Sequence, residues 1–203
     1  MKLFSHFAVI GFANTYLVGS DNGGDALIVD PGIMDIELLK LIEGNQFYIR
    51  HILVTTPHEA HVQGLKTLLR IYDATIYSGA RMVLEYPSTQ VHDGDTLDLS
   101  GFHVDVFNVS GHSKDSVVYR VEDALFSGDA IGAGRLGDSP NAYASAILKS
   151  TIQEKIEPLS DSLLIFPGHG PPTTLEAERK YNPSFTASTD ANNETVSGPP
   201  ESC

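Results

Sequence analysis

The sequence has one cysteine and few basic residues, and both shortages narrow the classes of protein it can represent. Cys203 alone provides no intrachain disulfide framework and no cysteine-rich zinc or iron–sulfur site, which is typical of a reducing compartment. The 13 Lys and Arg residues are outnumbered by 26 Asp and Glu residues and form no basic run, so we expect no nucleic-acid partner. No apolar run is long enough for a membrane-spanning helix, so we expect a cytoplasmic protein without a membrane partner.

The remaining composition is that of one globular domain followed by a polar tail. Apolar residues make up 41% of the 203 residues and charged residues 19%, which is sufficient for a buried core. From residue 183 onwards the chain is rich in Ser, Thr, Asn and Pro, with Phe185 and Val196 as its only large apolar residues. We therefore predict a domain over residues 1–182 and a disordered tail over residues 183–203.

Short β-branched or apolar segments alternate along this domain with amphipathic segments. Strands are predicted over residues 3–10, 14–18, 26–29, 51–55, 75–77, 102–109, 116–121, 124–127 and 163–166. Helices are predicted over residues 34–42, 62–72, 144–156 and 175–180. The mixture predicts an α+β fold in which mixed sheets are packed together and covered by helices.

Four histidines and one aspartate follow predicted strands, in most cases beside glycine. They are His58, His61, His112, Asp129 and His169. Because ligand sites in layered α/β proteins collect outside strand ends, we expect these side chains to converge. Imidazole nitrogens together with a carboxylate suit a divalent metal ion. The other histidines lie within predicted strands or turns and are interpreted as ordinary polar residues.

Several segments resemble the metallo-β-lactamase-fold hydrolases, in particular their short glyoxalase II-like branch. The similarity runs from about residue 3 to residue 184. The segments that carry it are Asn14-Thr15-Tyr16, Ile28-Val29-Asp30-Pro31-Gly32, Gly111-His112-Ser113, Leu125-Phe126-Ser127-Gly128-Asp129 and Phe166-Pro167-Gly168-His169-Gly170-Pro171-Pro172-Thr173-Thr174. The resemblance implies a four-layer αββα sandwich with a metal site at the joint edge of its two sheets.

The chain departs from this family in its main motif, H-x-H-x-D-H. The aligned segment is Thr56-Pro57-His58-Glu59-Ala60-His61, so threonine replaces the first histidine and alanine replaces the aspartate. Each of the two metal sites that the resemblance implies has therefore lost one protein ligand. The remaining ligands are His58, His112 and Asp129 at one site and His61, His169 and Asp129 at the other. We expect one or two divalent ions, with zinc as the first expectation and iron or manganese as alternatives.

The resemblance implies a metal-dependent hydrolase of a thioester or related ester, with a small-molecule substrate. Asp129 and His61 are the expected catalytic residues. Two alternatives stay open: a non-catalytic or metal-poor relative that only binds its ligand, and a mononuclear iron oxygenase similar to the persulfide dioxygenase branch. A homo-oligomer is compatible with each of these readings.

Overall fold

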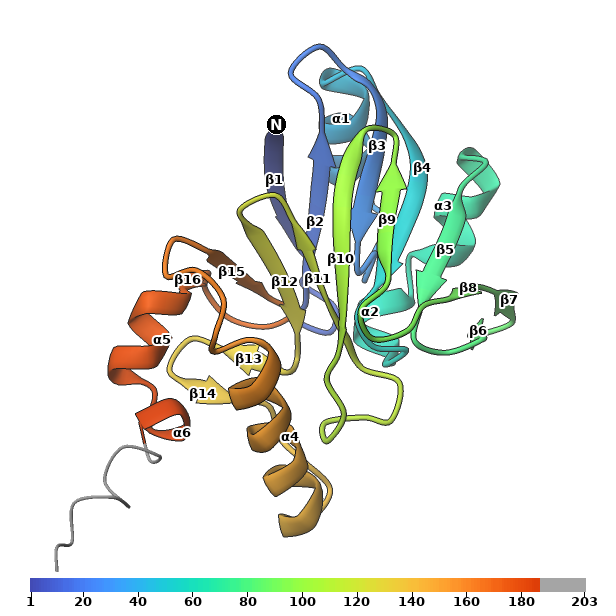
Figure 1. Ribbon diagram of the computed structural model, residues 1–203. Helices are drawn as coiled ribbons and strands as arrows, with labels where there is room; N and C mark the ends of the chain where they lie inside the picture. Colours follow the sequence, from blue (N-terminus) through green and yellow to red (C-terminus); the bar gives the residue numbers. More distant parts are fainter. Residues whose placement is uncertain (187–203) are drawn as a thin grey trace, which may run out of the picture.

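The computed structural model describes residues 1–186 and contains two six-stranded mixed sheets packed face to face (Figure 1). In spatial order, the first sheet consists of β1 (Lys2–Phe7), β2 (Asn14–Gly19), β3 (Gly24–Val29), β4 (Phe47–Val54), β5 (Thr75–Ser78) and β8 (Thr89–Gln90). The second sheet consists of β16 (Thr173–Thr174), β15 (Leu164–Pro167), β12 (Ala124–Gly128), β11 (Val117–Val121), β10 (Phe102–Asn108) and β9 (Thr96–Leu99). Two short hairpins lie beside them, β6 (Met82–Val83) with β7 (Tyr86–Pro87) and β13 (Ile131–Gly132) with β14 (Arg135–Leu136).

Helices cover the outer face of each sheet (Figure 1). The first sheet packs against α1 (Ile36–Gly44) and α3 (Leu65–Ile71), and the second against α4 (Ala142–Lys155), α5 (Leu175–Tyr181) and α6 (Pro183–Thr186). The one-turn helix α2 (Glu59–Val62) follows β4 through a short connection. The four-layer αββα sandwich expected from the sequence is thus confirmed. Within the described part of the chain, no helix is long and apolar enough to span a membrane.

The central strands read as continuous apolar runs because both of their faces are buried. In β3, Leu27 and Val29 face the core between the sheets, whereas Ile28 between them packs against the helices of the first sheet. In β11, Tyr119 likewise faces the other sheet and Val118 faces the outer helices. Burial on both faces places these strands in the interior of the sandwich, and the residues that follow them emerge at its edge.

Parallel pairing brings the strand ends to one edge of the sandwich. In the first sheet β3 pairs parallel to β4, and in the second β12 pairs parallel to β15. The carboxyl ends of each parallel pair therefore lie side by side. The segments that leave these strands meet where the two sheets adjoin.

Several element boundaries differ from the sequence prediction; the strand predicted over residues 51–55, for example, begins at Phe47, and two further differences lie near the site. The strand predicted over residues 3–10 ends at Phe7, and the apolar residues that follow form a loop. The helix predicted over residues 62–72 is divided at Gly64, where a Cβ atom would lie 2.6 Å from the carbonyl oxygen of Pro31. The two backbones approach so closely that position 64 has no space for any side chain. The Gly64 N–H donates to this Pro31 carbonyl at 2.8 Å instead of continuing the helix.

The first four residues of the predicted tail are helical in the structure. Residues 183–186 form α6, and Phe185 is buried in the core between the second sheet and its helices. The prediction rested on the polar composition of the whole segment, and this average conceals the one buried apolar side chain, Phe185. The rest of the predicted tail, residues 187–203, lies outside the described residues.

Candidate metal centre

Asp129 occupies the centre of the edge where the strand ends meet. It follows Gly128, whose φ is +52° and whose position leaves no space for a side chain, since a Cβ atom there would lie 2.2 Å from the Thr55 hydroxyl oxygen. The glycine lets β12 turn sharply and approach the end of β4. The carboxylate of Asp129 is thereby directed toward histidines from both sheets.

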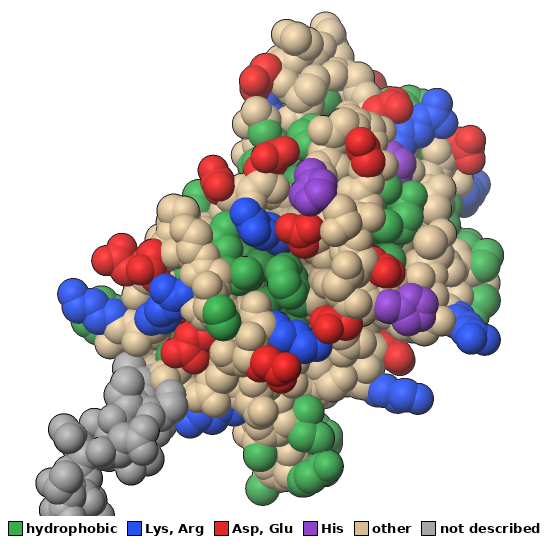
Figure 2. Space-filling view, in the orientation of Figure 1, with side chains coloured by type: hydrophobic (Ala, Val, Ile, Leu, Met, Phe, Trp, Pro, Cys, Tyr) green, Lys and Arg blue, Asp and Glu red, His purple; other side chains and the backbone are tan. Residues whose placement is uncertain are grey.

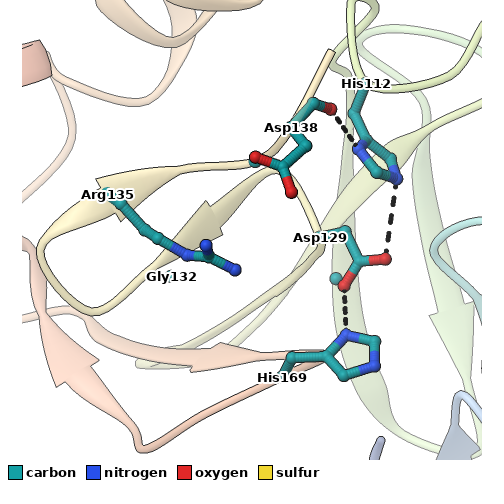
Figure 3. A pocket seen from close by; sticks show the side chains of 8 residues that line it. His112, Asp129, Gly132, Arg135, Asp138 and His169 are labelled. Carbon is teal, nitrogen blue, oxygen red and sulfur yellow. Dashed lines mark hydrogen bonds and ion pairs between the residues drawn. The ribbon is translucent and has the colours of Figure 1, made fainter. Parts of the chain in front are cut away.

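All four predicted histidines converge on this carboxylate. Oδ2 of Asp129 lies 3.1 Å from His61 Nε2, 3.5 Å from His112 Nε2 and 3.9 Å from His58 Nδ1. Its other oxygen, Oδ1, lies 2.6 Å from His169 Nδ1. Figure 3 shows His112 and His169 on the two sides of Asp129. The structure therefore brings together every residue that the sequence proposed for the site.

The five side chains divide into two groups that share Asp129. One group is His58, His112 and Asp129, the other is His61, His169 and Asp129, and within each the candidate ligand atoms lie within 4.8 Å of one another. This division matches the two incomplete ligand sets expected from the sequence. Each group offers two imidazoles and one carboxylate.

Three of the histidines have their second ring nitrogen bonded to an oxygen. His112 Nδ1 lies 2.7 Å from the carbonyl oxygen of Asp138, and His169 Nε2 lies 3.2 Å from that of Gly11. A carbonyl only accepts, so these two nitrogens donate, and the other nitrogen of each ring is the one directed at the centre, where it could serve as a ligand atom. Histidines that ligate a metal are commonly held in this way, so the donor set fits a divalent ion.

The third such histidine, His61, is held by a residue that the sequence did not single out as part of the site. Asp30 is buried and its Oδ2 lies 2.9 Å from His61 Nδ1. The same carboxylate accepts hydrogen bonds from the backbone N–H of Thr55 at 2.8 Å and from its hydroxyl at 2.6 Å. Asp30 therefore orients His61 from outside the ligand groups. The only sequence signal was its position in the strand-ending segment Ile28-Val29-Asp30-Pro31-Gly32.

The electrostatics of the cluster favour a bound cation. Burial alone would raise the pKa of Asp129, but hydrogen bonds with His169 and His61 outweigh it and hold this pKa well below its usual range. Burial alone would lower the pKa of His61, but Asp30 and Asp129 raise it to about 10. Two carboxylates thus retain a proton on a fully buried imidazole. A divalent ion would supply positive charge at the same place.

Neither of the two residues that replace family ligands offers an imidazole or a carboxylate. Thr56 is completely buried, and its hydroxyl has no hydrogen-bond partner among the described residues. Ala60 packs against Gly11 so closely that a Cβ atom built on that glycine would lie 3.1 Å from the Ala60 methyl group. The site therefore contains five protein ligands at most from this set.

A small pocket of about 210 Å3 opens beside the cluster. It is lined by His112, Gly128, Asp129, Gly132, Arg135, Gly137, Asp138 and His169. Figure 3 shows Arg135 extending from β14 toward this space. Of the described residues that line the pocket, it is the only arginine or lysine, so it offers a positive charge near the candidate ligands.

Glu178 anchors the hairpin that carries Arg135. Only 3% of this residue is exposed, and its two carboxylate oxygens accept a bifurcated hydrogen bond from the Gly134 N–H at 3.0 and 3.1 Å. It also accepts hydrogen bonds from the hydroxyl of Thr173 and the amide of Asn182. The pocket arginine and its anchor were both missed in the sequence, because neither belongs to a strand-end histidine segment.

The other histidines pair with groups elsewhere, as expected. His6 contacts Asp35, and His51 contacts Ser100. On the surface, Figure 2 shows acidic and basic side chains interspersed across one face of the molecule.

Comparison with known proteins places these residues in a family. The family model described as the metallo-beta-lactamase superfamily matches residues 8–169. An uncharacterized protein of Mycobacterium tuberculosis is 29% identical over 205 residues, covering 84% of this chain and 91% of that protein. The hydroxyacylglutathione hydrolase of Methylobacillus flagellatus is 32% identical over 150 residues, covering 70% of this chain but only 60% of the enzyme. The crystal structure of the BLEG-1 B3 metallo-beta-lactamase superposes with a TM-score of 0.81 at 25% identity, covering 91% of this chain and 100% of that one.

Proposed function

Because this chain belongs to the metallo-beta-lactamase superfamily, we propose that it is a metal-dependent hydrolase of a thioester or a related ester. The observation that supports this most directly is the pair of histidine–carboxylate groups that share Asp129. A divalent ion held there would lower the pKa of a bound water and polarise a carbonyl oxygen. We propose one or two ions, with zinc as the first candidate.

His61 and Asp129 are the proposed catalytic residues. Their side chains are fixed relative to each other at 3.1 Å, and His61 is held from behind by Asp30. Asp129 stays ionised because its imidazole neighbours stabilise the charge, so its oxygens are available to hold a cation and to accept a hydrogen bond that orients a nucleophilic water. Fixed positions at the reacting centre lower the entropy cost of reaching the transition state.

Arg135 supports a substrate that carries a negative charge. The pocket is small and polar, and a guanidinium at its edge would bind a carboxylate of the substrate in a bidentate manner. The relative from Methylobacillus is named as a hydrolase of hydroxyacylglutathione, which is a thioester. Because this chain spans only 60% of that enzyme, we do not carry its glutathione substrate over. We propose instead a smaller anionic thioester or ester, hydrolysed in the cytoplasm.

The experiment combines elemental analysis with hydrolysis assays on protein purified without added metal or chelator. We expect bound metal, turnover of small carboxylate-bearing thioesters, and loss of turnover on chelation. His112→Ala and His169→Ala should each reduce metal content and turnover, whereas His92→Ala, at an exposed turn, should change neither. Metal-replete protein without turnover on any thioester or ester would refute the proposal.

The donor chemistry favours one second candidate, a mononuclear iron oxygenase. Two histidines and one carboxylate with open positions are the ligand set of many iron(II) oxygenases, and each group has this composition. A single redox-active iron with oxygen consumption in the presence of a thiol-derived substrate would support it. Absence of any bound metal would favour the metal-poor binding relative.

A further inference from the structure

The side chain of Asn14, the first residue of β2, holds the segment that carries His169. Its amide nitrogen donates hydrogen bonds to the carbonyl oxygens of Pro167 at 3.0 Å and Gly170 at 2.8 Å. Both partners are carbonyls, which only accept, so the nitrogen of the amide and not its oxygen must face them. The backbone N–H of Asn14 donates to a third carbonyl of the segment, that of Gly168, at 2.7 Å. Asn14 thus fixes the backbone on both sides of His169.

The same segment is fixed from two further directions. The hydroxyl of Tyr16, which is buried between the sheets, donates to the Pro167 carbonyl at 2.6 Å. The backbone N–H of Gly168 donates to the carbonyl of the residue that precedes Asp129, at 2.7 Å. The segment is therefore tied to the first sheet through β2 and to the second sheet through β12. These ties hold His169 Nδ1 at 2.6 Å from Asp129 Oδ1.

Thr15, the residue between these two, fixes the partner of His61. It is completely buried, and its hydroxyl donates to the Asp30 carbonyl at 2.7 Å and accepts from the Gly32 N–H at 3.2 Å. The carboxylate of Asp30 in turn contacts His61 Nδ1 at 2.9 Å. Three successive residues of one strand therefore act on both histidines of the same ligand group.

The histidines of the other ligand group are held less firmly. The side chain of His58 is 48% exposed, and no described residue forms a hydrogen bond with its Nε2 atom. His112 has one carbonyl partner, that of Asp138, which lies in an exposed connection. Both groups share Asp129, so they differ in how firmly their histidines are placed. A side chain that is already fixed loses less conformational freedom when it binds an ion.

We propose that Asn14 is a positioning residue of the metal centre. By holding His169 against Asp129, it makes the group that contains these two residues the one with the higher affinity for a divalent ion. The inference rests on the metal binding in the proposed function and is independent of the substrate and the reaction. Residues that orient a metal ligand contribute roughly 10–100-fold to metal affinity. Because Asn14 acts on the backbone beside His169 and not on its ring, we expect about tenfold, the lower end of this range.

Asn14→Ala tests the inference, because it removes both side-chain hydrogen bonds and keeps the backbone N–H. Titration of zinc in competition with a chromogenic chelator gives the stepwise affinities, and we expect the higher one to fall about tenfold. The matched control is Asn45→Ala, which removes an amide that donates to the Leu41 carbonyl at 2.9 Å, at the end of α1. It should lower Tm to a similar extent and leave both zinc affinities unchanged. An unchanged affinity in Asn14→Ala would overturn the inference.

A double-substitution cycle shows whether the effect passes through His169. With His112→Ala, which leaves the other ligand group intact, Asn14→Ala should still lower the zinc affinity about tenfold. With His169→Ala, it should change the affinity by less than about twofold, because the side chain that it positions is absent. A tenfold loss in both backgrounds would show that Asn14 acts on another part of the centre, and this would overturn the inference.

The 15N resonances of the His169 ring provide a readout in the metal-free protein. They should shift in Asn14→Ala and stay unchanged in Asn45→Ala; resonances that stay unchanged in both would contradict a positioning role.

The outcomes also separate this inference from the proposed function. The expected zinc affinities in a protein that hydrolyses no ester would support the role of Asn14 while overturning the hydrolase. Ester hydrolysis that requires metal, together with equal zinc affinity in the wild type and in Asn14→Ala, would overturn the role of Asn14 alone.

Discussion

Asp30→Asn tests whether the orientation of His61 determines metal binding. The substitution keeps the size of the side chain but replaces Oδ2, which contacts His61 Nδ1 at 2.9 Å, with an amide that donates. His61 would then have to accept at Nδ1 and carry its proton at Nε2. With Nδ1 already accepting, that proton could not be released to a metal ion, so the nitrogen directed at Asp129, 3.1 Å away, would be blocked as a ligand. In serine proteases, an asparagine that imposes the wrong tautomer on the catalytic histidine strongly reduces turnover.

The expected magnitudes follow from these contacts. Residues that orient a metal ligand contribute roughly 10–100-fold to metal affinity. Because His61 belongs to only one of the two groups, this loss should fall on His61, Asp129 and His169, and leave His58 and His112 unaffected. The buried hydrogen bond between Asp30 and His61 is charge-assisted, so its loss should cost about 1.5–3 kcal/mol in the metal-free protein. At this chain length, that corresponds to a decrease in Tm of roughly 3–12 °C.

Metal titration, elemental analysis and the 15N resonances of the imidazoles together measure the effect. The matched control is Asp35→Asn, which removes a carboxylate that contacts His6 at 3.1 Å, away from the centre. It should leave metal affinity unchanged. If Asp30→Asn retained full metal affinity while His61 carried its proton at Nε2, the reasoning about the tautomer would be refuted.

Three further predictions test the assignment of the centre and of the pocket. Asp129→Asn should lower metal content at both groups, and elemental analysis showing one ion fully retained would contradict a shared carboxylate. The double substitution Thr56→His and Ala60→Asp should increase metal stoichiometry toward two in a titration; an unchanged value would mean that the present ligands already suffice. Glu178→Gln should raise KM for carboxylate-bearing esters as Arg135→Ala does, with kcat little changed. In the variant that carries both Glu178→Gln and Arg135→Ala, the increases in KM should be non-additive, and KM for neutral esters should not change. This result would identify Glu178 as a residue that positions Arg135.

The metal cluster could be predicted from the sequence because its position follows from strand ends. His112, Asp129 and His169 each come shortly after an apolar strand, and the sheets bring those strand ends to one edge. The local signal is strong for β12, which is buried on both faces and leaves little ambiguity about where it stops, whereas β10 and β15 alternate between buried and more exposed residues. The order of the layers could be predicted only from the family resemblance, because no short segment indicates which distant strands pair with each other.

The residues that orient the cluster could not be found in this way. Asp30 acts through a hydrogen bond to a histidine that lies 31 positions later, and Glu178 contacts a glycine 44 positions earlier. Glu178 has no local pattern that distinguishes it from an exposed carboxylate, and Asp30 has only its place in a strand-ending segment. The loop after β1 was assigned wrongly for a different reason. Val9 and Ile10 have the residue types of a strand, so the strand was predicted to continue past its true end at Phe7.

Burying the charged and polar groups of this site costs free energy, and this cost supports a role for the site in metal binding. Burying the carboxylate of Asp30 together with His61 is expensive, and well-packed apolar residues at such positions are often equally or more stable. The chain nevertheless keeps the oxygen partners that direct His61, His112 and His169 toward Asp129. These hydrogen bonds stabilise the metal-free fold as well, but together they leave one nitrogen of each ring directed at Asp129, as a bound cation would require. Thr56 and Ala60 reduce the number of ligands, but they leave the orientation of the remaining ones intact, and this combination favours a metal held by fewer protein atoms over a site that holds none.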